Sequence, residues 1–387
     1  MNNIIYKIGE GIVSPLGMTA NTMYEFVCKG DSRAKLYENT FGLPEPFFAS
    51  LLDEDLLDCA FSALWDYGVE GYTKVEKAAI VAAAQAIEEA NIAADREDVI
   101  FILSTTKGNV DLLAGNSYEP ERVYLWRTAQ LVAEFFDNPN TPMVVSNACI
   151  SGCAAQIAAV NQLRYGGYKY AVVIGAETLS QFVISGFQSF KALSPERCQP
   201  FDANRHGLNL GEAAAAIVYT IGSADLDLPV GTLVVRGAAI NNDANHISGP
   251  SRTGEGLLRA ITKANAGFDT SRLAFLNAHG TATLYNDDME SIAISRAGLQ
   301  DVPVNSLKGY FGHTLGAAGV LETILSARAL NDCRVLPTLG TDTPGTAAPV
   351  NVCLQPQTAK GDSFMKLISG FGGSNAAMTF TVVRDQN

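Results

Sequence analysis

The sequence has no long hydrophobic run. No stretch of its 387 residues approaches the roughly twenty consecutive apolar residues that a membrane-spanning helix needs. Its first residues contain no basic segment that leads into a long apolar run, as a secretory signal would. We therefore expect a cytoplasmic protein with no membrane partner.

Positive charge is also scarce. The chain has 27 Lys and Arg residues against 40 Asp and Glu residues, so its formal net charge is −13 at pH 7. Such a chain is repelled at long range by nucleic acids and anionic surfaces. We therefore expect no nucleic acid partner.

Paired cysteines are absent as well. The seven cysteines are odd in number and scattered, without the paired spacing of metal ligands. Cys149 and Cys153 are four residues apart, so they would share one helix face rather than form a zinc knuckle. The Gly-rich segment 370–375 lacks the Gly-Lys-Ser/Thr ending of a phosphate loop. We expect free thiols, no metal and no nucleotide cofactor.

Apolar residues, by contrast, are plentiful. They make up 47% of the chain, and charged residues make up 17%, so the protein can bury large cores. The length suggests roughly two to three domains.

One cysteine lies at an expected strand-to-helix turn, a position that favours a reactive thiolate. An apolar, β-branched run at 142–145 precedes Cys149, and small and apolar residues at helical spacing follow it as far as Arg164. We expect a strand that turns into a helix at Cys149. Backbone N–H groups and the helix dipole favour an anion there, so we expect the thiol to be held more readily as the nucleophilic thiolate. A buried cysteine that only packs is the alternative.

The same pattern occurs again later in the chain. Segment 303–322 is also a short strand, a turn with one reactive side chain and an Ala/Gly-rich helix, with His313 in the place of Cys149. Two further pairs of strands match in the same order. They are 99–103 with 273–277, and 171–175 with 365–373. We expect two similar α/β halves, 1–228 and 229–387, that bring together Cys149, His279, His313 and Phe371.

Four short motifs carry a family resemblance. They are Ala-Cys-Ile-Ser-Gly at 148–152, His-Gly-Thr-Ala-Thr at 279–283, Gly-His-Thr-Leu-Gly-Ala-Ala-Gly at 312–319 and Gly-Phe-Gly-Gly-Ser-Asn at 370–375. In this order they resemble the signature motifs of the β-ketoacyl-acyl-carrier-protein synthases, and the resemblance runs nearly end to end. It implies a thiolase-like fold of αβαβα layers and a Cys-His-His condensing enzyme.

The resemblance also implies roles for the motif residues. Cys149 would carry the acyl group, and its backbone N–H, with that of Phe371, would form an oxyanion hole. His279 and His313 would bind the malonyl thioester carbonyl. Lys308 and Glu322 match family positions that form a charged shell around the histidines. The Phe371 side chain would be a gate over the thiol.

The same resemblance suggests groups that bind the substrate's carrier. The hydroxyls of Thr281 and Thr283 would bond the pantetheine arm; the alternative is that they only satisfy turn backbone. Lys191 lies where the family has a cation that contacts the acyl carrier protein; the alternative is a solvated surface lysine.

Three features around the acyl channel depart from the family. Lys107 lies near the expected pocket floor, Ser369 replaces a Phe beside the gate, and the segment before Cys149 is short. Together they suggest a specialised pocket for a short, polar or conjugated acyl group, because a long alkyl chain would bury the ammonium unpaired. Alternatively, Lys107 turns to solvent or pairs with an acid.

The predicted function is therefore decarboxylative condensation of a Cys149-bound acyl group with malonyl-acyl carrier protein, in fatty acid or polyketide/polyene-type synthesis. The expected partners are acyl carrier protein, whose phosphopantetheine carries the substrates, and a second copy of the chain. The main alternative is a non-catalytic subunit like the chain-length factors. A thiolase, with Cys353 as its late cysteine, and a thioester hydrolase are lesser alternatives.

Overall fold

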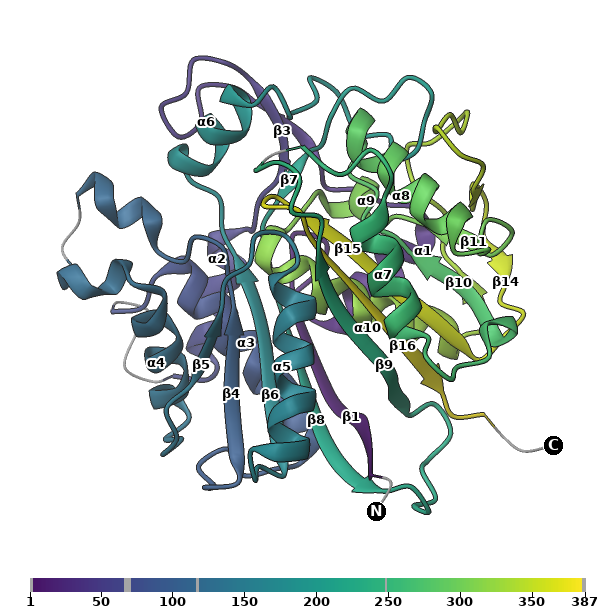
Figure 1. The fold of residues 1–387 in the computed structure, drawn as a ribbon. Coiled ribbons are helices and arrows are strands. Elements are labelled where there is room, and N and C mark those ends of the chain that lie inside the picture. Colours follow the sequence, from purple (N-terminus) through teal and green to yellow (C-terminus); the bar gives the residue numbers. More distant parts are fainter. Residues whose placement is uncertain (1–2, 66–70, 116–117, 248, 385–387) are drawn as a thin grey trace.

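A sheet of eleven strands runs through the protein (Figure 1). The computed structural model describes residues 3–65, 71–115, 118–247 and 249–384. Across the sheet the strand order is β13, β11, β10, β15, β16, β9, β1, β8, β6, β4 and β5. In chain order these strands span Asn3–Val13 (β1), Val99–Ser104 (β4), Met143–Val145 (β5), Tyr170–Glu177 (β6), Ala213–Ser223 (β8), Leu233–Asn242 (β9), Leu273–Asn277 (β10), Pro303–Asn305 (β11), Asn351–Val352 (β13), Ser363–Gly370 (β15) and Ser374–Val382 (β16).

The two halves of this sheet repeat one strand order. Read inward, β5, β4, β6, β8 and β1 form one half, and β11, β10, β15, β16 and β9 form the other, with β13 as an additional edge strand beside β11. In each half, parallel pairs among the first three strands are followed by antiparallel pairs. The halves join where β1 pairs with β9, at Ile5 with Val235 and Tyr6 with Val234. The duplicated α/β fold expected from the sequence is confirmed.

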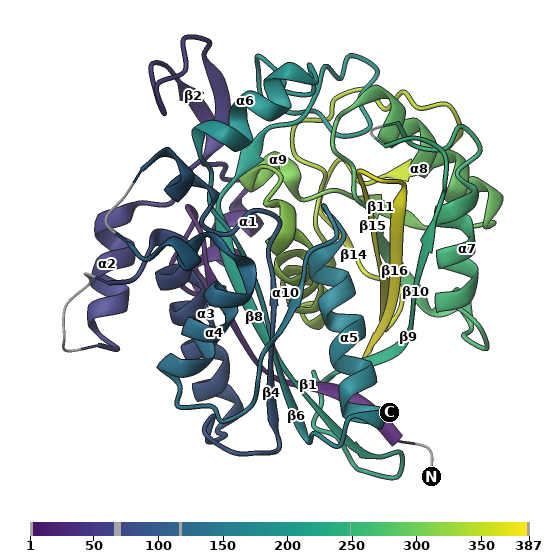
Figure 2. The ribbon, with the colours of Figure 1, turned by 60° about the vertical axis from the view of Figure 1, so that its left-hand side comes forward.

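Helices form three layers around the two halves. α5 (Ser151–Tyr165) and α10 (Ala318–Asn331) lie between them and contact each other, as Figure 2 shows. On the outer faces, α3 (Lys74–Ala90) covers the first half, and α7 (Glu255–Ala264), with α8 (Leu284–Arg296) beside it, covers the second. The result is the αβαβα layering of a thiolase-like fold.

The remaining elements are short. They are the helices Ala20–Lys29 (α1), Glu54–Ser62 (α2), Leu125–Phe135 (α4), Gln181–Ser189 (α6) and Lys308–Phe311 (α9), the 3-10 segments Val110–Ala114 (η1), Pro120–Val123 (η2), Thr270–Arg272 (η3) and Leu315–Ala317 (η4), and the strands Lys35–Tyr37 (β2), Phe47–Ser50 (β3), Leu210–Gly211 (β7), Arg334–Val335 (β12) and Gln357–Thr358 (β14). Within the described ranges, no helix combines the length and the hydropathy that crossing a membrane requires.

The connection between the halves runs from the end of β8 to the start of β9. The predicted boundary between residues 228 and 229 falls inside it. Because β1 and β9 pair directly, the halves share one sheet. That each half is a separate domain stays a prediction.

The local sequence explains the elements that carry the site. β4 reads Val-Ile-Phe-Ile-Leu-Ser and is buried at every residue, as expected of a parallel strand covered on both faces. α10 is buried at 12 of its 14 residues, so its apolar residues surround the whole helix rather than form one stripe. Such a helix is stable only inside a core, and this places the His313 turn at its N-terminal end in the middle of the protein.

The two central helices approach each other through glycines. A Cβ atom on Gly319 would lie 2.4 Å from the backbone N of Cys153, and one on Gly152 would lie 2.9 Å from the backbone N of Gly319. Both contacts involve backbone atoms, which cannot rotate away. The distance between α5 and α10, and therefore between the turns that precede them, depends on these glycines.

We predict that Gly319→Ala destabilises the protein by about 1–3 kcal/mol, because the added methyl group forces α5 and α10 apart. Gly186→Ala is the matched control: Gly186 lies in α6 with no atom near the position of its Cβ, so this change is expected to be neutral or to stabilise by up to about 1 kcal/mol. Urea denaturation measures both. Equal stability of the two variants would contradict this account of the helix contact.

Candidate active site

Cys149 lies in the turn between β5 and α5. Ala148, just before it, has a positive φ of 45°, which turns the chain sharply into the helix. The Ser151 hydroxyl fixes this turn, because it accepts from the Asn147 N–H at 2.8 Å and donates to the Ala148 carbonyl at 2.6 Å. Cys149 is buried, with 8% of its surface exposed, next to the N-terminal end of α5. The predicted strand-to-helix position is observed.

Two histidines from the other half face this cysteine. His279 follows β10, and His313 lies between α9 and η4. Their ring centroids are 4.9 Å apart, with the planes at 81°. The Cys149 sulfur and one ring nitrogen from each histidine all lie within 4.8 Å of one another. The structure therefore brings together side chains that are separated by 130 and 34 residues in the sequence.

Backbone hydrogen bonds hold the two histidine turns. The N–H groups of His279 and Gly280 donate to the two carboxylate oxygens of Glu290 at 2.7 and 2.6 Å. The His313 N–H donates to the carbonyl of Asn209 at 2.7 Å. These bonds leave the imidazole rings free. Nδ1 of His279 and both ring nitrogens of His313 are buried and have no hydrogen-bond partner within the described part of the chain.

Burial sets the charge of all three groups. It lowers the pKa of His279 and of His313 well below the ordinary value, and the positive charge of Lys308 lowers both further. Both rings are therefore neutral at neutral pH, and each has one N–H donor. Burial raises the pKa of the Cys149 thiol to about 11, although Lys308 and the Phe371 backbone N–H act in the opposite direction.

The expectation that Cys149 is held as a thiolate is therefore wrong for the free protein. The cations Lys308 and Lys107 and the Phe371 N–H do favour the anion, but the loss of hydration at a buried sulfur outweighs them. The resting group is a thiol beside two neutral imidazoles.

A sulfur and two imidazole nitrogens are also atoms that zinc binds. They would supply three of the four ligands of a tetrahedral site, so a metal here would keep an open position. The expectation that the protein uses no metal stays a prediction.

A cluster of charged residues lies inside the core close to the histidines. Lys308 and Glu322 form a buried ion pair, with 2.8 Å between Nζ and Oε1. The other carboxylate oxygen of Glu322 pairs with Lys366 at 2.5 Å. Burial disfavours the Glu322 carboxylate, yet the two ammonium groups together hold its pKa below its ordinary value. Sequence reasoning missed Lys366, although a single charge within the apolar strand 363–368 was a signal.

Phe371 lies over the site in a Gly-rich turn. Its ring is 37% exposed and packs on Phe187 at 5.9 Å and on Phe190 at 5.7 Å, measured between ring centroids. A Cβ on Gly370 would lie 3.1 Å from the backbone N of Cys149, so glycine permits the turn to approach Cys149. The Phe371 N–H acts to lower the pKa of the Cys149 thiol. A gate over the thiol remains the role predicted for the ring.

A cavity of about 540 Å³ leads from the surface to this centre. Cys149, His279 and His313 lie at its inner end. The other predicted residues that line it are Thr281, Thr283, Lys191, Ser369 and Phe371. The hydroxyls of Thr281 and Thr283 are 2.9 Å apart, and the Lys191 side chain is exposed. The residues predicted to contact pantetheine and the carrier therefore line the same cavity.

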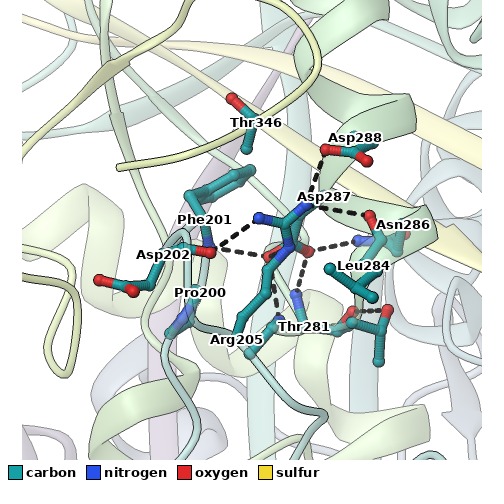
Figure 3. A network of polar contacts seen from close by, with 12 residues as sticks. Pro200, Phe201, Asp202, Arg205, Thr281, Leu284, Asn286, Asp287, Asp288 and Thr346 are labelled. Atoms are coloured by element: carbon teal, nitrogen blue, oxygen red, sulfur yellow. Dashed lines mark hydrogen bonds and ion pairs between the residues drawn. The ribbon is translucent and has the colours of Figure 1, made fainter. Parts of the chain in front are cut away.

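A network of polar contacts supports the wall of this cavity beside Thr281 (Figure 3). The Asp287 carboxylate accepts from the backbone N–H groups of Thr281, Ala282 and Phe201 at 2.8 to 3.1 Å. Arg205 lies against the same carboxylate at 3.9 Å and pairs with Asp288 at 2.7 Å. These acids shape the turn after His279 rather than face the thiol.

Lys107 does not line this cavity. It is half-buried, its Nζ lies 3.5 Å from the Thr106 carbonyl, and its backbone N–H donates to Glu177 at 3.1 Å. Its charge nevertheless reaches the site, because it lowers the pKa of Cys149. A role at the floor of an acyl pocket stays a prediction.

Glu177 is a second residue that sequence reasoning missed. It ends β6 and is buried, and its carboxylate accepts from the N–H groups of Thr106, Lys107 and Gly316 at 2.8 to 3.1 Å. It thereby ties the loop after β4 to the segment after His313. An acid at the end of the apolar strand 170–177 was the available signal.

A family model described as "Beta-ketoacyl synthase, N-terminal domain" matches residues 5–220, and one described as "Beta-ketoacyl synthase, C-terminal domain" matches residues 232–342. The Staphylococcus aureus protein named 3-oxoacyl-(acyl-carrier-protein) synthase 2 is 28% identical over 422 residues, which cover 98% of both chains. A Rhizobium meliloti protein of that name is 33% identical over 259 residues, which cover 62% of this chain and 60% of that one.

Solved structures of ketosynthases have a similar fold. A ketosynthase in complex with its chain length factor from Xenorhabdus doucetiae has a TM-score of 0.85 and 25% identity, with 98% of both chains covered. The β-ketoacyl synthase of Burkholderia phymatum, at 24% identity and a TM-score of 0.86, shows the same fold.

The layered fold, with a cysteine and two histidines where its halves meet, defines a protein of the thiolase-like class. More narrowly, the chain belongs to the β-ketoacyl synthase family, which is a family of acyltransferases.

The raised pKa of Cys149 can be tested by alkylation. Because the thiolate is the reactive form, we predict that the rate of carbamidomethylation by iodoacetamide rises about tenfold per pH unit from pH 7 to 10. Mass spectrometry of the Cys149 peptide measures the rate, with the exposed Cys59 and Cys333 as references in the same digest, and circular dichroism verifies that the fold persists. A rate that is already constant between pH 7 and 8 would show that Cys149 is a thiolate in the free protein, and it would contradict this prediction.

Proposed function

We propose that the protein is a β-ketoacyl-acyl-carrier-protein synthase, which condenses a Cys149-bound acyl group with malonyl-acyl carrier protein in fatty acid or polyketide/polyene-type synthesis. The observation that carries the proposal is the Cys149 sulfur within 4.8 Å of one nitrogen from each of two neutral imidazoles at the inner end of a cavity. No cofactor beyond the phosphopantetheine of the carrier takes part.

The first step is acyl transfer. The Cys149 sulfur attacks the carbonyl of the acyl carrier thioester, and a C–S bond to Cys149 forms as the bond to the carrier sulfur breaks. The thiol proton passes to the departing carrier thiolate. The backbone N–H groups of Cys149 and Phe371 stabilise the tetrahedral oxyanion; the loss of one such donor typically costs on the order of 3 kcal/mol.

The second step consumes the malonyl thioester. Its carboxylate leaves as carbon dioxide, and the electron pair of the broken C–C bond forms the enolate of the thioester. The N–H donors of His279 and His313 bind the enolate oxygen, because each neutral ring has one N–H to donate. The enolate carbon then attacks the acyl-Cys149 carbonyl, a C–C bond forms, and the Cys149 thiolate is expelled and reprotonated.

Acyl carrier protein is the proposed partner. Lys191 is exposed at the mouth of the cavity, and its charge suits an acidic carrier even though the chain as a whole has a net charge of −13. One solved neighbour is titled as a ketosynthase with a type II polyketide acyl carrier protein. We also propose that two copies pair through the edge strand β5, and that the protein works in the cytoplasm.

A non-catalytic partner subunit is the second candidate. Two of the solved neighbours come from structures titled as a ketosynthase with its chain length factor, so a protein with this fold occurs in such complexes. The complete Cys149, His279 and His313 cluster favours the catalytic subunit. The lesser thiolase alternative requires a second cysteine at the site, but Cys353 does not line the cavity.

We predict that the wild-type protein converts an acyl carrier thioester and malonyl carrier protein into a β-ketoacyl product, and that Cys149→Ala lowers this rate at least about a thousandfold. Chromatography of the product measures the reaction, and Cys333→Ala is the control for an exposed thiol. Product formation by Cys149→Ala at the wild-type rate would contradict the mechanism. Absence of an acyl adduct on wild-type Cys149, measured by intact-protein mass spectrometry, would favour the partner subunit.

The proposed preference for a short, polar or conjugated acyl group depends on Lys107. We predict that Lys107→Ile raises the turnover of long saturated acyl chains by about tenfold, because an apolar side chain removes the cost of burying an ammonium beside an alkyl chain. Acyl carriers from acetyl to palmitoyl, assayed with both proteins, test this. If both proteins accept palmitoyl and acetyl groups equally well, Lys107 does not select the substrate.

A further inference from the structure

A lysine lies inside the core, in the middle of a strand. Lys366 belongs to β15, which is buried from Ser363 to Ser369, and Lys366 has no exposed surface. Side chains alternate along a strand, so Lys366 shares one face with Phe364 and Ile368. Both of these residues belong to the hydrophobic core that includes α10. The ammonium therefore points into the layer between the two halves of the sheet.

Four oxygen atoms surround this ammonium. Nζ lies 2.5 Å from the Glu322 carboxylate and 3.0 Å from the Leu367 carbonyl. It also lies 3.5 Å from the carbonyls of Asn277 and Ala278, the last residues before His279. The contacts join α10, β15 and the end of β10. In the parallel pairing of β10 and β15, Lys366 is the direct neighbour of Asn277.

The neutralisation of Glu322 does not require this lysine. Lys308 already pairs with Glu322 at 2.8 Å, so a second buried ammonium leaves the three side chains with a net positive charge. Burial lowers the pKa of Lys366, although the Glu322 carboxylate acts in the opposite direction. Burial of an ion costs several kcal/mol, and an apolar side chain in a buried strand is often at least as stable. A stability role therefore does not account for Lys366.

The surplus positive charge lies close to both histidines. It lowers the pKa of His279 and of His313, together with burial and Lys308. The contacts of the ammonium with the Asn277 and Ala278 carbonyls place it at the strand end that carries His279. Lys366 thus lies on the side of the site where the two imidazoles meet.

We propose that Lys366 is a positioning residue for the malonyl half of the reaction: its ammonium holds the strand end that carries His279 against α10, and its charge favours the enolate bound between the histidines. This inference rests on the proposed function, because it assigns Lys366 to the decarboxylation step. The residue acts through His279 and does not touch the substrate.

The test separates the two steps. Enzyme acylated beforehand on Cys149 is mixed with malonyl carrier protein, and release of carbon dioxide is measured in single turnovers at several malonyl carrier concentrations. For Lys366→Met we expect the maximal rate to fall about 10- to 100-fold. The half-saturating concentration and the rate of Cys149 acylation, followed by mass spectrometry, are expected to change by less than about threefold.

Chemical rescue by an added amine distinguishes a role of the ammonium group from a purely structural role. Lys366→Ala leaves a cavity lined by the same four oxygen atoms. Added propylammonium is therefore expected to raise the decarboxylation rate of this variant at least about tenfold. Lys263→Ala, at an exposed lysine of α7, controls for effects of the amine itself. If Lys366→Met does not fold, Lys366→Gln, which keeps hydrogen-bond donors without the charge, is measured in the same way.

Three outcomes would overturn the inference. The first is decarboxylation at the wild-type rate by folded Lys366→Met or Lys366→Gln. The second is an equal loss in the rates of acylation and decarboxylation. The third is a folded Lys366→Ala that remains slow and gains no rate from propylammonium. The proposed function fails differently, because a wild-type protein that releases no carbon dioxide from the malonyl carrier contradicts the function itself.

Discussion

The close packing of α5 against α10 is the constraint on which the site depends. Each helix follows a turn with one reactive side chain, and the two turns meet because Gly152 and Gly319 let the backbones approach. Neither half of the chain contains the complete site, since Cys149 comes from one half and His279 and His313 come from the other. Duplication therefore explains the composition of the site as well as the architecture: one strand-turn-helix unit supplies Cys149, and its copy supplies His313.

Loss of hydration decides the charges at this centre. It keeps both imidazoles neutral and raises the pKa of Cys149, so the free site holds no thiolate, although a helix N-terminus and a cation are close by. A neutral thiol and two N–H donors suit a reaction in which negative charge develops only during turnover. Lys308 and Lys366 then matter as fixed positive charges in a medium of low polarity, where charge interactions are stronger than in water.

The sequence predicted the parts of this account that depend on local pattern and repetition. The strand-turn-helix units around Cys149 and His313, and the match of strand 99–103 to strand 273–277 as repeats, follow from apolar spacing and motif order. The layered fold is what the family resemblance implied. The thiolate expectation failed because burial outweighs the helix dipole, and burial depends on the other half of the chain. Lys366 was missed because its partners, Glu322 and the Ala278 carbonyl, are 44 and 88 residues away.

The structure of the protein after reaction with an acyl carrier tests the central claim most directly. The account predicts an acyl group bonded to the Cys149 sulfur, with its carbonyl oxygen within hydrogen-bond distance of the N–H groups of Cys149 and Phe371 and the two imidazoles open toward the cavity. An unmodified Cys149, or an acyl carbonyl that points away from both N–H groups, would contradict it.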